Sequence, residues 1–467
     1  MDTKLLVADF EDWRETVTEA VALLEQGEVV ALPTETVYGL AACAFNPEAV
    51  AKVFEVKERP TFDPLIVHIG SESDLRKVAI IPEEIKELVN ELIEAHWPGA
   101  LTLVLPKHPD VPDLVTSGLD TVAVRFSAHE VMREVARIHG PIAAPSANRF
   151  GRLSPTSAQA VMAELGGRIP LIIDGGACRD GLESTIIAPT MTEKGPVLRL
   201  LRPGPVSKED LRLIAKIEKV KNKPGAPIEA PGQIASHYAP ATPLMIVEKP
   251  GQFVPEEGKK YGLLTYRGSG GACLIDLTEW TATQTLSPGK GKLSEAAVRF
   301  FYCLRELDAA GLDMIVAEPV ANVGVGVAIM DRLNRRRPPP CVRMIARCLL
   351  LFLFFQGGLG AQVRMKLADG FDFPVGNPDA EGYYKARGMR LRPPVHFGED
   401  WNGTGGGDSD LHDPIYAVAD GVVMFAADVK VGWGRVMLIR HAYRDPATGQ
   451  VKFVDSQYGH LRKLLVK

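Results

Sequence analysis

The stretch Leu32-Pro33-Thr34-Glu35-Thr36-Val37-Tyr38-Gly39-Leu40 follows the apolar run Val29-Val30-Ala31 and precedes an alanine-rich segment. A short β-type run that is broken by proline and closed by glycine is typical of a strand that ends in a turn. In α/β sheets, ligands bind beyond the ends of such strands. We therefore expect Thr34 and Thr36 to point their hydroxyl groups toward a ligand. A strand with a merely polar end is the alternative, and the residue types alone leave both interpretations open.

The composition indicates a multidomain globular protein. A chain of 467 residues is too long for one hydrophobic core and predicts about three domains. The formal net charge of −5 gives no electrostatic argument for nucleic-acid binding by the whole chain. The six cysteines form no Cys-x-x-Cys pair, and the N-terminus lacks the apolar core of a signal peptide. We expect a reducing, cytoplasmic location.

Helical and strand patterns alternate along the first two thirds of the chain, which predicts an α/β domain with a mixed sheet. Helical spacing occurs at 11–26, 47–56, 82–95, 131–138 and 157–165, and strand patterns occur at 65–69, 101–105, 122–125, 141–144 and 171–174. A helical pattern at 208–217 precedes a linker rich in Lys, Pro, Gly and Ala at 219–231. Strand patterns at 244–247, 261–265 and 314–317, with helices at 294–310 and 327–336, predict a second, small Rossmann-like domain without a Gly-x-Gly-x-x-Gly motif.

The segment 338–362 differs from the rest because residues 349–355 contain no polar residue and small residues follow them. This layout is typical of a secretory signal peptide, and the run is too short to span a bilayer. A buried helix or strand is the alternative. We interpret the segment as the junction of a fusion or of two joined reading frames, and the sequence does not separate these two origins.

Basic residues in the first domain suit a negatively charged ligand. Lys57 and Arg59 lie two positions apart at the end of a helical pattern, and Arg125 ends a strand pattern. Lysine offers a point charge, and arginine offers paired hydrogen bonds to phosphate or carboxylate. A lone arginine at a strand end is more often part of a surface ion pair, so the residue types alone do not decide.

Several ordered motifs carry a family resemblance. They are 33–40, Lys57-Glu58-Arg59-Pro60, 64–69, Trp97-Pro98-Gly99, 118–125, 143–148 with Ser154-Pro155-Thr156, 174–176, 181–185 and 200–204. Together they resemble the YrdC/Sua family, the threonylcarbamoyl-adenylate synthases. The resemblance implies that the L-threonine pocket is formed by Thr36, His68, Arg125, Ala144 and Ser184. It also implies that ATP meets Arg59, Asp63, Thr121, Ser146, Ser154, Arg202 and His237, with Lys57, Arg59 and Ser146 as the catalytic set.

Three features depart from the family pattern. After Val124-Arg125 the chain has Phe126-Ser127, where the family usually has a small apolar residue and proline. Asp63 stands where the family often has Asn, and an acidic group near phosphate would repel ATP unless Mg²⁺ bridges them. The linker keeps His237-Tyr238-Ala239-Pro240, which resembles a segment that folds over the nucleotide, but 233–236 replaces a basic stretch. We expect ATP with Mg²⁺ as substrate and a lid that closes less tightly.

The last part of the chain resembles the LytM/lysostaphin-type zinc endopeptidases. His396 and Asp400 match two zinc ligands, and His460 matches a catalytic histidine. A hydrolytic zinc site needs three protein ligands, and the third, from a later His-x-His, is missing. Zinc in the tail is therefore not expected, and a β-rich remnant without activity is the favoured interpretation.

These observations predict five segments. They are a YrdC-like twisted mixed-sheet domain at 1–207, a linker or lid at 208–240, a Sua-type Rossmann-like α/β domain at 241–337, the signal-peptide-like segment at 338–362 and a truncated LytM-like β-rich tail at 363–467. The resemblance implies a nucleotidyltransferase that converts L-threonine, bicarbonate and ATP into threonylcarbamoyl-AMP and pyrophosphate. Its product would pass to the threonylcarbamoyl-transfer machinery that acts on tRNA, with no membrane involved for the first two domains. The alternatives are an RNA-binding YrdC-like module and an incomplete cell-wall zinc endopeptidase.

Overall fold

The computed structural model describes residues 2–8, 13–219, 229–231, 239–249, 252–268, 274, 278–289 and 291–335, and strands between residues 367 and 461. Two compact units are present, one made of 1–221 and 228–351 and the other of 222–227 and 352–467. His237, His396 and the segment predicted to resemble a signal peptide lie outside the described residues.

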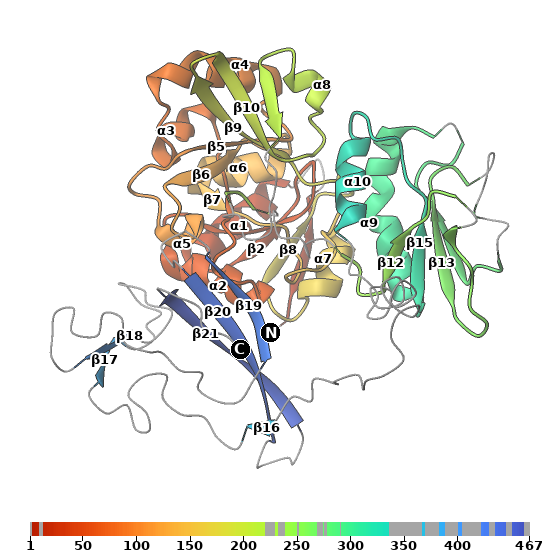
Figure 1. Ribbon diagram of the computed structural model, residues 1–467. Coiled ribbons are helices and arrows are strands. Elements are labelled where there is room, and N and C mark those ends of the chain that lie inside the picture. Colours follow the sequence, from red (N-terminus) through yellow and green to blue (C-terminus); the bar gives the residue numbers. More distant parts are fainter. Residues whose placement is uncertain are drawn as a thin grey trace. The chain divides into compact units, whose positions relative to one another are not determined.

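The first domain alternates helices and strands as the sequence patterns predict (Figure 1). Its strands are β1 (Lys4–Val7), β2 (Val30–Leu32), β3 (Gly39–Cys43), β4 (Ile66–His68), β5 (Leu101–Pro106), β6 (Thr121–Arg125), β7 (Ile142–Ala143), β8 (Leu171–Asp174), β9 (Thr185–Thr192), β10 (Gly195–Arg202) and β11 (Lys216–Lys219). Its α-helices are α1 (Trp13–Glu25), α2 (Pro47–Lys57), α3 (Leu75–Val78), α4 (Lys86–His96), α5 (Asp113–Thr116), α6 (Glu130–His139), α7 (Ala158–Leu165) and α8 (Lys208–Leu211), and short 3-10 turns lie at Glu72–Asp74 and Glu83–Ile85.

The strands form one 11-stranded sheet in the order β1-β8-β2-β3-β7-β4-β6-β5-β9-β10-β11. Neighbours such as β4 and β6 are parallel, whereas β5 and β6, and β9 and β10, are antiparallel. The mixed sheet expected from the sequence is confirmed.

Strand β2 explains why helices pack on both faces of this sheet. Its side chains alternate, as the two-residue period of a strand requires. Val30 and Leu32 lie in a hydrophobic cluster with residues of α1 and α6, whereas Ala31 lies in the larger cluster with residues of α2, α4 and α7. A strand that is covered on both sides reads as a continuous apolar run, which is the pattern in the sequence.

Helix α2 ends where the predicted phosphate-binding residues begin. The Asn46 side chain caps its start by accepting hydrogen bonds from the N–H groups of Glu48 and Ala49, at 3.0 and 3.2 Å. Its end is marked by Glu58, a non-glycine residue in the left-handed region at φ 54°. Such conformations cost free energy and concentrate at functional sites. The turn directs the chain from Lys57 to Arg59 past the end of the helix.

The helix expected over 208–217 is wrong in its second half. A capping box between Ser207 and Asp210 starts α8, which ends at Leu211. Residues Lys216–Lys219 then form β11, which pairs in parallel with β10. The hydrogen bonds available at the edge of β10 outweigh a weak local helical preference here. The sequence patterns also missed the β9–β10 hairpin.

The second domain is a small parallel α/β unit, as expected. Its sheet has the order β12-β15-β13-β14, made of β12 (Leu244–Ile246), β13 (Tyr261–Thr265), β14 (Ala282–Thr285) and β15 (Met314–Ala317). Helices α9 (Leu293–Ala309) and α10 (Gly326–Asn334) pack against these strands (Figure 1). The core of this domain also takes in Val37, Leu153 and Leu182 from the first domain, so the two domains share one hydrophobic cluster.

The second compact unit consists of strands where it is described. They are β16 (Leu367–Ala368), β17 (Tyr383–Arg387), β18 (Asp400–Gly403), β19 (Val422–Asp428), β20 (Arg435–Arg444) and β21 (Val451–Leu461). Strand β20 pairs with β16, β19 and β21, and β17 pairs with β18. The β-rich character expected for the tail is present in these strands. In the described part of the chain, no helix is both long and apolar enough to cross a membrane.

Candidate active site

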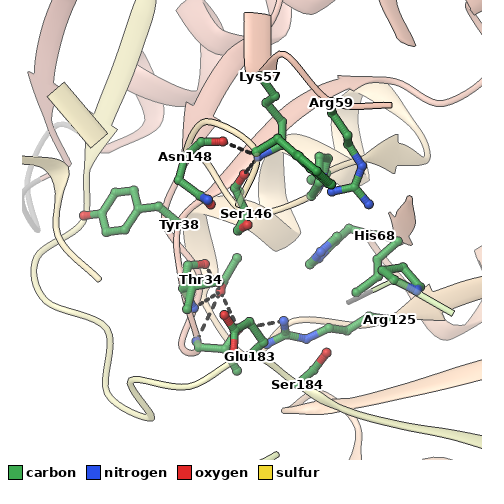
Figure 2. Close-up of a pocket in the computed structure, with 18 of the residues that line it drawn as sticks. Thr34, Tyr38, Lys57, Arg59, His68, Arg125, Ser146, Asn148, Glu183 and Ser184 are labelled. Carbon is green, nitrogen blue, oxygen red and sulfur yellow. Dashed lines mark hydrogen bonds between the residues drawn. The ribbon is translucent and has the colours of Figure 1, made fainter. Parts of the chain in front are cut away.

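A cleft opens at the ends of several strands of the large sheet (Figure 2). Most of the charged residues in its lining are basic, and the one acidic residue in the lining is Glu183. The basic residues are Lys57, Arg59, Arg125, Arg152 and Arg202. A cleft with this balance attracts a ligand of high negative charge.

The turn after β2 forms one wall of the cleft. The Thr34 hydroxyl donates to the carbonyl of Val37 at 2.6 Å and accepts from the N–H groups of Thr36 and Val37. The Thr34 and Thr36 hydroxyl oxygens are 2.9 Å apart, and both residues line the cleft. The expectation of a strand that ends in a threonine-bearing turn at a pocket is confirmed.

Strand register brings His68 and Arg125 together, because they are paired residues at the ends of the parallel strands β4 and β6. The Arg125 guanidinium donates from Nε to the carbonyl of Gly99 at 3.2 Å and from Nη1 to the Thr36 hydroxyl at 2.7 Å. Its Nη2 lies 2.8 Å from Oε1 of Glu35, and both side chains are buried. Glu35 therefore holds Arg125 from behind while the guanidinium lines the cleft.

Electrostatic effects fix the charge states of this group. Burial alone would raise the pKa of the Glu35 carboxyl, but the Arg125 charge and the hydrogen bond from Ser127 outweigh it and lower the pKa to about 2. Burial and the same Arg125 charge lower the pKa of His68 to about 3. The His68 imidazole is therefore neutral at neutral pH and can accept or donate a hydrogen bond.

Lys57 lies fully buried beneath the cleft and ties down the loop that follows β7. Its ammonium donates to the carbonyls of Ser146, at 2.5 Å, and Asn148 (Figure 2). The same loop is bound to the turn after β2, because the N–H of Ala147 donates to the carbonyl of Tyr38 at 2.8 Å. Burial, with a further contribution from Arg59, lowers the pKa of the Lys57 ammonium well below its usual range.

Asp63 proves to be the partner of Arg59. Its Oδ2 lies 2.9 Å from Arg59 Nη2, and both side chains are buried. Arg59 also donates to the carbonyls of Asp63 and Pro64, at 3.1 and 2.7 Å. The Asp63 charge is thus compensated within the protein, and the residue is not part of the lining of the cleft. The repulsion of ATP by Asp63 stays a prediction, and the ion pair with Arg59 argues against it.

The far wall is built on Ser184 and Arg202. Arg202 donates from Nε to the Ser184 carbonyl and from Nη2 to the Ser184 hydroxyl, both at 3.0 Å. The Ser184 hydroxyl also lies 2.7 Å from that of Thr102. Arg202 Nη1 donates to the carbonyl of Pro231 at 3.4 Å, and Pro231 lines the cleft. The described piece of the linker, 229–231, therefore reaches the site, whereas His237 lies outside the described residues.

Most of the residues predicted from sequence meet in the cleft. Those in its lining are Thr36, Lys57, Arg59, His68, Arg125, Ala144, Ser146, Ser184 and Arg202. Three others, Asp63, Thr121 and Ser154, are not in the lining. Sequence reasoning gave no role to Glu35, Arg152 and Glu183. Glu35 and Glu183 stand inside motifs that were quoted, and both are buried, which only the structure reveals.

The Glu35–Arg125 pair makes a testable contribution to acid stability. Because folding lowers the Glu35 pKa from 4.5 to about 2, the stabilisation is complete above pH 4.5 and is lost as the pH falls toward 2. Its full size is about 3 kcal/mol. We expect the free energy of unfolding of wild type minus that of Glu35→Gln to be largest above pH 4.5 and to shrink toward pH 2, as measured by denaturant unfolding at each pH.

A suitable control is Glu83→Gln, which removes a carboxylate at an exposed pair with Lys86. We expect its unfolding curve to stay close to that of wild type, since exposed pairs contribute little. A difference between wild type and Glu35→Gln that does not change with pH would contradict the assignment.

Comparisons with known proteins agree with this geometry. The family model described as "Telomere recombination", the Sua5/YciO/YrdC model, matches residues 22–204. The model described as "Threonylcarbamoyl-AMP synthase, C-terminal domain" matches residues 206–336. A threonylcarbamoyl-AMP synthase of Pyrococcus abyssi is 41% identical over 341 residues, which are 70% of this chain and 94% of the relative. One of Bacillus subtilis is 39% identical over 353 residues, which are 72% of this chain and 98% of the relative.

Among solved structures, Pyrococcus abyssi Sua5 complexed with L-threonine matches with a TM-score of 0.60 and 38% identity, covering 72% of this chain and 97% of the other. The twisted mixed sheet with a basic cleft at its strand ends, joined to a small parallel α/β domain, defines a two-domain protein of the YrdC-like class. More specifically, the chain belongs to the threonylcarbamoyl-AMP synthase family. Members of this family are nucleotidyltransferases that use ATP.

Proposed function

We propose that the cleft converts L-threonine, bicarbonate and ATP into threonylcarbamoyl-AMP, pyrophosphate and water. The observation that carries this proposal is the convergence of Lys57, Arg59, Arg125, Arg152 and Arg202 on one cleft. A triphosphate and an amino acid carboxylate together supply the negative charge that such a cleft requires. The relatives' name and the L-threonine complex of the Pyrococcus abyssi protein support the substrate assignment.

The reaction needs no nucleophile from the protein. The threonine amine bonds to the carbon of bicarbonate, and loss of water leaves a carbamate. A carbamate oxygen then attacks the α-phosphorus of ATP, the bond between that phosphorus and the bridging oxygen breaks, and pyrophosphate leaves with the electron pair. Such a reaction is accelerated mainly by holding the reactants together and by stabilising the charge that develops on phosphate oxygens.

The wall formed by β4, β6 and the turn after β2 is the proposed threonine end. Arg125 suits the carboxylate, because Glu35 and the Gly99 carbonyl hold its guanidinium in place. The neutral His68 and the Thr36 hydroxyl offer hydrogen bonds for the amine or the side-chain hydroxyl. Ala144 and Ser184 complete the proposed pocket, and both line the cleft.

Other residues of the cleft form the proposed nucleotide end. Arg59 and Arg202 line the cleft with arginine donors suited to phosphate oxygens. Lys57 holds the loop that carries Ser146, because its Nζ donates a hydrogen bond to the Ser146 carbonyl. His237 is proposed to contact ATP from the linker, as the family segment at 237–240 suggests. Thr121 and Ser154 remain proposed contacts, although neither is in the lining described here.

Among its described lining residues, the cleft has one carboxylate, Glu183. Among the described residues, no group of three or more His, Cys, Asp or Glu side chains could hold a metal. Asp63, Glu183 and Glu35 are each paired with an arginine. Mg²⁺ is often bound by few protein ligands together with substrate phosphates. We propose that it enters as part of the Mg·ATP substrate.

The product is proposed to serve the threonylcarbamoyl-transfer machinery that modifies tRNA in the cytoplasm. No specific observation favours either alternative function, the RNA-binding module or the zinc endopeptidase. The cleft is lined by basic residues, but the formal net charge is −5 and we found no interleaved aromatic and basic stripe in the sequence. For a zinc endopeptidase, His396 lies outside the described residues and Asp400 is described only as the first residue of β18.

The direct test is pyrophosphate release from ATP that depends on both threonine and bicarbonate. We expect a chain ended after Arg337 to keep kcat/KM within about twofold of the full chain, because the matching family models end at residue 336. Pyrophosphate release that does not depend on threonine would exclude the proposed reaction. Activity that is lost on shortening, while the shortened chain remains folded by circular dichroism, would instead assign the tail a part in the site.

A further inference from the structure

The segment between β8 and β9 faces the cleft with its last two residues. Ser184 accepts hydrogen bonds from Arg202 and lies beside Thr102, as described above. Glu183 precedes it, lines the cleft, and accepts a hydrogen bond from the buried Ser154 hydroxyl at 2.5 Å. The position of this segment therefore decides where the Ser184 hydroxyl and the Arg202 guanidinium lie.

The same segment is packed against the second domain. Leu182 is buried in the hydrophobic cluster that contains Phe300 and Phe301 of α9. Gly181 adopts a left-handed conformation at φ 68°, and a Cβ atom added there would lie 2.4 Å from the Cα of Val298. Only glycine permits this approach of the two backbones. Residues 181–184 thus lie between the second domain and the cleft.

A buried ion pair connects the two sides. Arg332 of α10 is fully buried, and its Nε donates to Oε2 of Glu183 at 3.0 Å. Asp331 orients the same guanidinium, because its Oδ2 lies 2.7 Å from Arg332 Nη1. Arg335 in turn holds Asp331, because its Nε lies 2.9 Å from Asp331 Oδ2. A second-domain arginine is therefore fixed in place against a carboxylate that lines the cleft.

We propose that Arg332 is a positioning residue for the active site, which acts through Glu183 to hold residues 181–184 so that Ser184 and Arg202 meet the substrates. The second domain then contributes to activity by positioning residues of the cleft. This inference rests on the proposed function. A purely structural role, in which the pair only joins the two domains, is the competing explanation.

The first test compares Arg332→Met with Arg332→Lys. We expect Arg332→Met to lower kcat/KM for ATP by about tenfold or more at a temperature where circular dichroism shows it folded, since Glu183 loses its buried partner. Arg332→Lys keeps the positive charge and should recover part of the loss. The matched control is Arg299→Met on α9, whose Nε donates to the Thr285 carbonyl within the second domain. It should leave the kinetics unchanged.

A double-mutant cycle separates positioning from simple loss of stability. If Arg332 acts through Glu183, the combined variant Arg332→Met/Glu183→Gln is no slower than the slower single variant. Gly181→Ala displaces the same segment without changing any charge and should also lower kcat/KM. Fully additive effects would overturn the proposal. So would an Arg332→Met variant with a lower unfolding temperature and unchanged kcat and KM.

ATP binding measured by calorimetry distinguishes this inference from the proposed function. If the wild-type chain binds ATP but releases no threonine-dependent pyrophosphate, the proposed reaction fails, and weaker ATP binding by Arg332→Met still supports the positioning role. If Arg332→Met matches wild type in both ATP binding and kcat/KM, the positioning role fails. If the wild-type chain binds neither ATP nor threonine, both proposals are excluded.

Discussion

Arg125→Ala should lower kcat/KM for threonine by roughly 10- to 150-fold. The guanidinium is the proposed partner of the threonine carboxylate, and a hydrogen bond to a charged group contributes about 1.5–3 kcal/mol. The same change leaves Glu35 buried without the charge that lowers its pKa to about 2. An uncompensated buried charge costs about 3–5 kcal/mol of stability. Steady-state kinetics and denaturant unfolding of the same preparation measure the two effects.

The two losses can be separated because they have different origins. Arg125→Ala/Glu35→Gln removes the orphaned carboxylate, so we expect it to regain much of the stability and none of the activity. Arg137→Ala removes an arginine from an exposed pair with Glu134 and serves as the control for both measurements. An Arg125→Ala variant with an unchanged KM and kcat for threonine would show that threonine does not bind at the wall formed by β4, β6 and the turn after β2.

The elements with strong local patterns were predictable from the sequence. The helices at α2 and α6 and the strands at β5 and β8 lie within a few residues of their expected bounds. The strands β9, β10 and β11 were not predicted, because β9 and β10 pair with each other and β11 depends on the edge of β10. Local propensity does not encode such a partner. The order of the strands in the large sheet also followed only from the structure.

For the candidate site, too, the sequence predicted some features and only the structure revealed the others. His68 and Arg125 came from motifs far apart in the sequence, and the register of β4 and β6 places them side by side. What the motifs did not reveal is the set of residues that holds them: Glu35 behind Arg125, and Arg332 against Glu183. These pairs join residues that are distant in sequence, and each charge alone reads as a surface residue. Burial, which changes that interpretation, is visible only in the folded chain.

Arg59→Ala should lower kcat/KM for ATP by about 10²–10³-fold, which is the usual effect of removing one preorganised donor from a developing negative charge. Arg59 lines the cleft while Asp63 and the Pro64 carbonyl fix its guanidinium. The loss should appear in pyrophosphate release at saturating threonine and bicarbonate. Arg168→Ala, at an exposed pair with Glu58 one residue away from Arg59, tests whether any nearby arginine has the same effect.

The variant Asp63→Asn tests whether Asp63 repels ATP or instead orients Arg59. If Asp63 repelled the triphosphate, its neutral replacement would tighten ATP binding. The structure leads to the opposite expectation, because Asp63 Oδ2 lies 2.9 Å from Arg59 Nη2 and holds it toward the cleft. We expect Asp63→Asn to raise KM for ATP, with a smaller effect than Arg59→Ala, since the asparagine oxygen can still accept one hydrogen bond. A lower KM for ATP would show that the charge of Asp63 reaches the nucleotide despite its pairing with Arg59.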